Sequence, residues 1–267
     1  MLSKDDIDKY LDTIPPIPNT VRLTLFHLNN NDMVQAANIA KEDKIFSAYL
    51  SEIVNKPIFG FVNDVKNVNQ IFGILGLGKS RQIVASYYMQ LITPSDWEVF
   101  DFSNKKFQEL QTNLIMAWDE ILKELKIDDK NLQQSISLIP ASLIVCEMIF
   151  RDIKETILLL RESKHMSFDE ILYKMSGYKL FDVVLKIAKK CEFDDDIISF
   201  MKDFSGFRVQ DKIKETKRKE IAFLRLLINH EMSKPYIVNS GLNDFFDFPM
   251  DFTQSDIAQF LKIRQKI

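Results

Sequence analysis

The chain has 267 residues, of which 46% are hydrophobic and 27% charged, and its formal net charge is −3 at pH 7. This length and composition are typical of a soluble globular protein with one large or two small domains. The small negative charge gives no general reason to bind nucleic acid. Only seven glycines are present, which disfavours a turn-rich β protein and favours helices throughout.

The N-terminus and the apolar runs favour a soluble, cytoplasmic protein without membrane contact. Acidic residues stand at the start of the chain, where a secretion signal would need an apolar stretch. The most apolar window, residues 136–150, is too short to span a bilayer and contains Pro140 and Glu147. Cys146 and Cys191 lie far apart in the sequence, and we expect them to be buried thiols in a reducing compartment.

Helices are expected from the N-terminus onward. A capping pattern at residues 3–6 starts a helix that ends before Pro15 and Pro16. Apolar residues at helical spacing predict two further helices, and then another over residues 45–54 that ends before Gly60.

Helices are also expected beyond residues 93–96, the sequence Thr-Pro-Ser-Asp that marks the clearest internal boundary. The first is a long amphipathic helix over residues 104–125. A buried helical segment over 130–150, interrupted near Pro140, comes next. The following helices are predicted over residues 153–160, 167–177, 180–190, 195–204 and 209–231. Thr253 with Asp256 is expected to cap a final helix.

Four residues match the phosphate-loop pattern G-x-x-x-x-G-K-S: Gly73, Gly78, Lys79 and Ser80. Such a loop works between a buried strand and a helix, where backbone N–H groups surround the phosphates. The apolar residues before Gly73 recur every three to four positions, which indicates a helix instead of a strand. The context that a phosphate loop needs is therefore not predicted here.

We expect instead that Gly76 and Gly78 end one helix and allow the next to start at once. Lys79 and Arg81 would then lie in solvent or contact a partner. An ATP- or GTP-binding switch that uses Lys79 and Ser80 stays as an alternative.

With residues 73–80 taken as part of a helix, turn, helix, the first third of the chain resembles an HDOD domain, a helical bacterial signalling module related to the HD phosphohydrolases. The resemblance rests on a proline-rich entry, an Asn-x-x-x-Phe-Gly motif and a later Leu-Gly pair. The residues that carry these motifs are Pro15, Pro16, Asn55, Gly60, Leu75 and Gly76. The chain departs from the family at Lys56, where members have Ser, and at Ile71 and Phe72, where Ala-Ile is usual.

The resemblance implies an all-α, HD-like bundle of two packed lobes with a C-terminal helical extension. We expect an N-terminal helical lobe over residues 1–95, an HD-like lobe over 96–205 and the extension over 206–267. It also implies a bacterial signal-transduction protein that regulates motility or other environmental responses through contacts with partner proteins.

An active HD hydrolase needs a His, a His-Asp pair and a further Asp to hold its metal ions. The three histidines, His27, His165 and His230, are not followed by Asp. Where ligands would be expected, the sequence has Leu-Gln-Thr-Asn at 110–113 and Leu-Ile-Pro-Ala at 138–141. We therefore expect no catalytic, cofactor or metal site and a non-catalytic role. The alternative is a divergent metal-dependent phosphohydrolase acting on nucleotides.

Two segments are candidate interaction surfaces. Residues 212–220 carry five basic side chains, but interleaved acids favour a solvated helix face over a nucleic-acid contact. Phe245, Phe246 and Phe248 are expected to fold back on the bundle, with an exposed partner-binding patch as the alternative.

Overall fold

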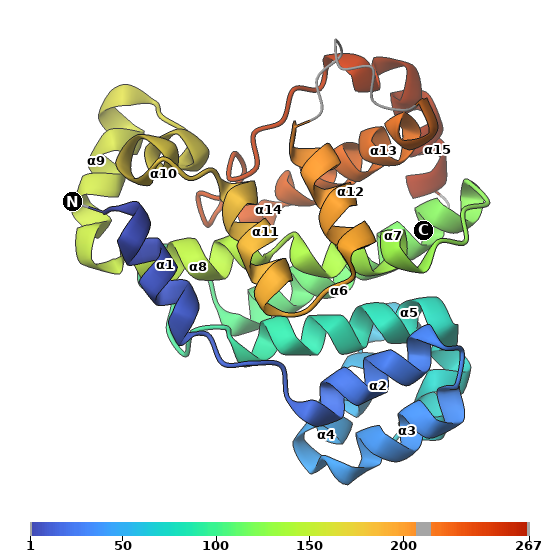
Figure 1. The fold of residues 1–267 in the computed structure, drawn as a ribbon. Helices are drawn as coiled ribbons and strands as arrows, with labels where there is room; N and C mark the ends of the chain where they lie inside the picture. The colour runs from blue at the N-terminus through green and yellow to red at the C-terminus, as the bar shows by residue number, and fades with distance from the viewer. Residues whose placement is uncertain (1, 207–214, 266–267) are drawn as a thin grey trace.

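The structure is a computed structural model that describes residues 2–206 and 215–265. Over this part of the chain, all regular secondary structure is helical (Figure 1). The predicted all-α fold is therefore confirmed. No helix in the described ranges is both long and apolar enough to cross a lipid bilayer.

The N-terminal lobe is a group of helices packed on one another. Its members are α2 (Asn19–Asn29), α3 (Met33–Glu42), α4 (Lys44–Val54) and α5 (Val68–Leu91). Aspartates cap the short helices, because Asp32 accepts the Gln35 N–H and Asp43 accepts the N–H groups of Ile45 and Phe46. A short 3-10 helix, η1 (Pro57–Phe59), follows α4.

Helix α5 is the centre of the molecule. It contacts α2, α3 and α4 on one side, and α6, α7 and η2 of the second lobe on the other. Residues 80–89 are all buried, as expected for a helix enclosed on every face. The predicted break between two helical segments is found at Gly76, whose φ of +71° and ψ of 173° are not helical, and the second segment follows the first at once. Gly78 lies within the helical segment after Gly76 and does not end a helix.

The second lobe is built from shorter helices around α6 and α8. The elements are α6 (Asn104–Glu124), α7 (Lys130–Ser135), η2 (Ile136–Leu138), α8 (Ala141–Phe150), η3 (Arg151–Ile153), α9 (Lys154–Lys164), α10 (Phe168–Ser176), α11 (Leu180–Lys190) and α12 (Asp195–Gly206). Pro140 is the N-cap residue of α8, which accounts for the predicted interruption. Cys146 and Cys191 are buried free thiols, and burial raises the pKa of both.

Helix α1 (Lys4–Thr13) packs against the second lobe, although it precedes the N-terminal lobe in the chain (Figure 1). It contacts α8, and Asp8 accepts hydrogen bonds from Tyr178 at 3.0 Å and pairs with Lys186 at 2.9 Å. The spatial lobes therefore differ from a simple division at residue 95.

The C-terminal helices cover α6 of the second lobe. They are α13 (Glu215–Met232), α14 (Pro235–Val238), η4 (Asp251–Asp256) and α15 (Ile257–Arg264). The predicted cap at Thr253 is wrong. Its hydroxyl donates to the Met250 carbonyl inside the 3-10 turn, and α15 begins without a side-chain cap. The predicted start of the long helix near residue 209 lies outside the described residues.

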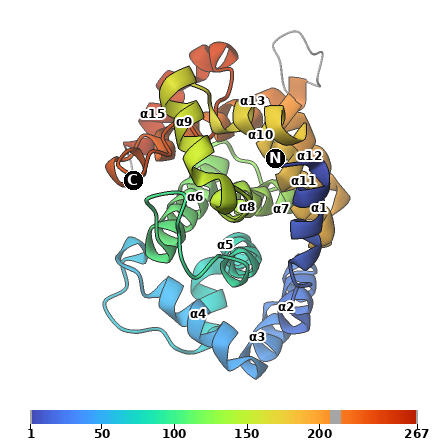
Figure 2. The ribbon, with the colours of Figure 1, turned by 90° about the vertical axis from the view of Figure 1, so that its left-hand side faces the viewer.

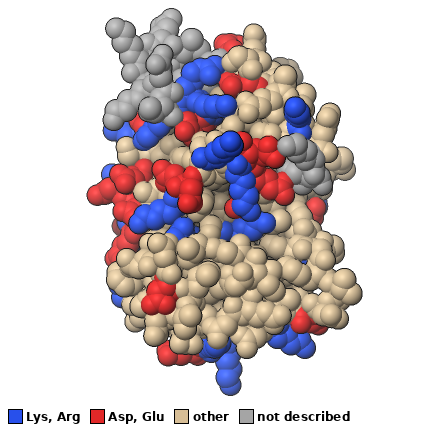
Figure 3. Space-filling view, turned by 90° about the vertical axis from the view of Figure 1, so that its right-hand side faces the viewer, with Lys and Arg blue, Asp and Glu red and all other residues tan. Residues whose placement is uncertain are grey.

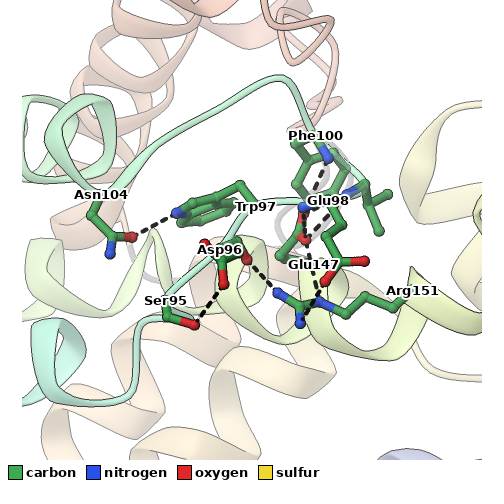
Figure 4. A network of polar contacts seen from close by, with 9 residues as sticks. Ser95, Asp96, Trp97, Glu98, Phe100, Asn104, Glu147 and Arg151 are labelled. Atoms are coloured by element: carbon green, nitrogen blue, oxygen red, sulfur yellow. Dashed lines mark hydrogen bonds and ion pairs between the residues drawn. The ribbon is translucent and has the colours of Figure 1, made fainter.

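One buried carboxylate holds the segment that joins the two lobes, residues 92–103. Glu147 on α8 is fully buried, and its oxygens accept the backbone N–H groups of Glu98, Val99 and Phe100 at 2.6 to 3.2 Å (Figure 4). Arg151 lies one turn later, 3.6 Å from the same carboxylate, and donates to the Asp96 carbonyl. The connection is therefore fastened to the core of the second lobe.

We expect Glu147→Ala to lower the free energy of unfolding by about 3 kcal/mol or more, because each buried N–H left without an acceptor costs about 1–3 kcal/mol. Urea unfolding followed by circular dichroism measures the change. Glu98→Gln is the matched control, since the Glu98 side chain is mostly exposed, and should stay within about 0.5 kcal/mol of wild type. Equal stability of the two variants would contradict the role given to Glu147.

Candidate functional site

A large hollow lies between the two lobes. It is a groove of about 1050 Å³ bounded by α4, η1, the C-terminal end of α5 and the N-terminal half of α6. Figure 2 views α5 along its axis, with α4 below it and α6 above it. The volume is at the upper end of the range for ligand sites, so we name this region the interlobe groove.

Asn55 shapes the α4 wall of the interlobe groove. Its amide accepts the Val65 N–H at 2.8 Å and donates to the Val65 carbonyl at 3.1 Å. Ser51 also donates to that carbonyl, at 2.9 Å. These bonds close the loop after α4, in which Gly60 has the left-handed φ of +71°. The motif residues Asn55 and Gly60 thus position Lys56, Pro57 and Ile58 along the groove.

The other motif residues support α5, which forms the floor of the groove. Pro15 and Pro16 are exposed in the extended segment before α2, and the Tyr88 hydroxyl donates to the Pro15 carbonyl at 2.5 Å. Leu75 packs in the core beside the kink at Gly76. All of these contacts are structural.

Two tyrosines that the sequence analysis did not select line the groove. Tyr49 on α4 and Tyr87 on α5 pack together with ring centroids 4.8 Å apart, and Phe46 stacks on Tyr87 at 4.7 Å. Within the described residues, neither tyrosine hydroxyl has a hydrogen-bond partner among the side chains or backbone. Burial raises the pKa of both, so each hydroxyl keeps its proton and can donate it.

The rim of the groove carries both signs of charge. Glu52 and Glu109 are exposed acids, and Lys56 and Lys105 are bases. Burial lowers the pKa of Lys56, and the two glutamates oppose that effect. Gln108 on α6 donates to Glu52 on α4 at 3.1 Å, so one hydrogen bond crosses the groove between the lobes.

Arg81 is not the solvent-facing or partner-binding residue that the sequence predicted. It is 5% exposed, and its guanidinium donates to the Leu28 carbonyl at 2.9 and 3.1 Å, to Asn31 at 2.8 Å and to Gln133 at 3.3 Å. The carbonyl groups around Arg81 in α5 are used in helical hydrogen bonds, so its guanidinium takes acceptors from the α2–α3 corner and from α7.

Lys79 is also engaged inside the protein. Its amine lies 3.5 Å from Asp119, which is nearly buried and is shared with Lys123 at 2.8 Å. Residues 73–80 belong to α5, so no strand precedes the phosphate-loop pattern and its structural context is not formed. The sequence predicted a partner surface at Lys79 and Arg81. In the structure both side chains instead make contacts within the protein.

The C-terminal phenylalanines fold back on the bundle. Phe245 and Phe246 are buried, and Phe248 is partly buried against the core. Phe246 and Phe248 both pack near Phe181 on α11, with centroids 6.0 and 5.5 Å away. The structure therefore agrees with the expectation that these phenylalanines fold back on the bundle. The three rings do not form an exposed patch.

The basic run is paired with acids where the structure describes it. Lys217 lies 3.3 Å from Asp203, and Arg218 lies 3.2 Å from Asp256. Lys212 and Lys214 lie outside the described residues. Figure 3 shows both signs of charge side by side over the upper half of one face, and a lower half, over the N-terminal lobe, with few charges.

The positions where an HD enzyme would hold metal carry poor ligands here. Leu110, Leu138 and Ile139 are buried apolar residues. Gln111 is buried with both amide atoms unpartnered, and a neutral amide cannot replace the imidazole or carboxylate of such a centre. Among the residues that the structure describes, no three His, Cys, Asp or Glu side chains are grouped to bind a metal ion. The donor set does not fit an HD metal centre.

The comparisons with known proteins agree with this fold. A family model for the HDOD domain matches residues 14–204. A proposed phosphohydrolase from Shewanella amazonensis has a similar structure, with a TM-score of 0.65, 12% identity and 97% of each chain covered. An HDOD domain protein of unknown function from Geobacter sulfurreducens gives a TM-score of 0.61 and 13% identity, covering 97% of this chain and 95% of that one. No curated protein matches the chain.

Arg81→Met should lower the free energy of unfolding by about 3 kcal/mol, because it removes buried charge-assisted hydrogen bonds to the Leu28 carbonyl, Asn31 and Gln133. Arg81→Lys should also destabilise, since an ammonium cannot reproduce the planar fork. Urea unfolding gives both values. Lys79→Ala serves as the control, with a loss of less than about 1 kcal/mol because Lys123 keeps Asp119 paired. A stable Arg81→Met variant would show that the internal contacts of Arg81 are dispensable.

Proposed function

Because this chain belongs to the HDOD domain family, we propose that it is a non-catalytic regulatory module of the cytoplasm that acts in signal transduction by contacting other proteins. The single observation that carries this proposal is the interlobe groove. It is a large site formed by the motif-bearing loop after α4 and by α5 and α6, and its lining offers hydrogen bonds and apolar contacts without a group suited to catalysis.

The chemistry of the groove supports binding over reaction. Its lining contains Tyr, Asn, Gln, Thr, Lys and Glu side chains but no His or Cys. The two glutamates, Glu52 and Glu109, are exposed, and neither lies in the water-excluded setting that favours general acid catalysis. Such a lining recognises a partner by complementary shape and hydrogen bonding.

Phosphohydrolysis, which is proposed for the Shewanella protein, is the competing function. In this chain it would need metal ligands where Gln111 and buried apolar residues stand. The three histidines are spread over the end of α2, the residue after α9 and α13. The residues at hand therefore favour the regulatory role.

Metal analysis of the purified protein separates the two functions. We expect far less than one equivalent of Mn, Fe or Zn per chain, and no release of product from nucleotide phosphodiesters in the presence of added metal. An active HD phosphodiesterase measured alongside supplies the positive control. Stoichiometric metal together with turnover would overturn the non-catalytic assignment.

Affinity purification from the native cell tests the contact with other proteins. The whole chain, tagged and expressed at its natural level, should co-purify with one or a few proteins in near-stoichiometric amount, as judged by mass spectrometry. An unrelated tagged protein of similar size controls for background. Recovery of the chain alone, after cross-linking in the cell, would count against a role that depends on protein contacts.

A further inference from the structure

Polar groups without partners lie in the interlobe groove. Tyr49 is 8% exposed and Tyr87 is 4% exposed, and neither hydroxyl finds a hydrogen-bond partner within the described part of the chain. The Gln90 amide oxygen, which also lines the groove, is buried and unpartnered as well. The two tyrosine hydroxyls are not fully enclosed and line the groove, so both can donate a hydrogen bond to a molecule that enters it.

Apolar side chains stand exposed in the same groove. Ile45 is 73% exposed, Ile58 is 43% exposed and Leu91 is 41% exposed, and all three line it. Large apolar side chains that gather at a concave site mark contacts with other molecules. The occupant therefore brings apolar groups for these three residues and hydrogen-bonding groups for the tyrosines.

The charges of the rim limit the kind of occupant. Glu52 and Glu109 are matched by Lys56 and Lys105, so the groove has no net charge from these four groups. A nucleotide or another polyanion would meet two glutamates, and a polycation would meet two lysines. An occupant with few charges complements this rim best.

The neighbouring residue shows how α5 binds extended chain. Tyr88 donates to the carbonyl of Pro15 at 2.5 Å, in the segment between α1 and α2 that has no helical hydrogen bonds of its own. Carbonyls in a helix are already paired, whereas those of an extended segment are free to accept. Tyr87 on α5 and Tyr49 on α4 offer the same donor in the groove.

We propose that the interlobe groove binds an extended, weakly charged peptide segment of a partner protein. Main-chain carbonyls of the segment accept hydrogen bonds from Tyr49 and Tyr87, and its apolar side chains cover Ile45, Ile58 and Leu91. Docking of extended segments in aromatic-lined grooves is a recurrent mode of peptide recognition. This inference rests on the proposed regulatory function and specifies the chemistry of the partner.

Selection from a phage-displayed library of random peptides, with the purified whole chain as the target, tests the proposal. We expect the enriched peptides to be rich in apolar residues, often with proline, and poor in charge. Their affinity, measured by fluorescence anisotropy, should fall about fivefold in Tyr87→Phe, which corresponds to about 1 kcal/mol for one neutral hydrogen bond. Ile58→Lys, which changes an exposed residue, should weaken binding by about tenfold or more.

Tyr173→Phe is the matched control, because Tyr173 is exposed on α10, outside the groove. It removes the same hydroxyl as Tyr87→Phe and should leave the affinity unchanged. Circular dichroism confirms that all three variants are folded; Tyr87→Phe loses only an unpartnered hydroxyl and should keep its stability.

Three results would overturn the proposal. One is a selection that enriches no peptide, and another is a set of peptides whose binding is unchanged in both Tyr87→Phe and Ile58→Lys. The third is a dimer in sedimentation that Ile58→Lys dissociates, since the groove would then hold a second copy of the chain. If cellular partners still co-purify with the Ile58→Lys chain, the groove assignment fails while the regulatory function stands.

Discussion

Enclosure of α5 over residues 80–89 is the constraint on which the rest of the molecule depends. A buried charged side chain in that stretch needs hydrogen-bond acceptors from the protein, and Arg81 finds them in the Leu28 carbonyl, Asn31 and Gln133. A guanidinium keeps its charge at any accessible pH, so these acceptors have to stay in place. The α2–α3 corner and α7 are thereby fixed to α5. The position of the groove also depends on α5, because both of its walls, α4 and α6, pack on that helix.

The helices and several of their ends were predictable because the responsible interactions are local. Ser3 with Asp6 forms the capping box of α1, and Ser167 with Glu170 forms that of α10, as their spacing indicates. Apolar spacing also predicted a helix over residues 45–54, and α4 spans Lys44–Val54. Thr253 and Asp256 have the same spacing as a capping box. The chain forms a 3-10 helix at these residues, however, so Thr253 does not cap α15.

The internal role of Arg81 and the groove itself were not predictable, because both depend on residues distant in sequence. The acceptors of Arg81 lie about fifty residues before and after it, and a basic residue beside Gly-Lys-Ser is typical of a surface. The adjacent residues Tyr87 and Tyr88 could have indicated the groove wall from the sequence, but the sequence analysis did not select them. Adjacent residues of a helix point in different directions, so two buried tyrosines in succession require separate environments, and one of these is the groove wall.

The chain passes between its two lobes twice, and hydrogen bonds hold both connecting segments in place. The first passes Pro15, which Tyr88 holds, and the second is the segment held by Glu147. Two lobes joined by one flexible connection can rotate freely relative to each other. Two connections that are held at separate points restrict that rotation. Moving α4 away from α6 at the interlobe groove would also break the hydrogen bond from Gln108 to Glu52.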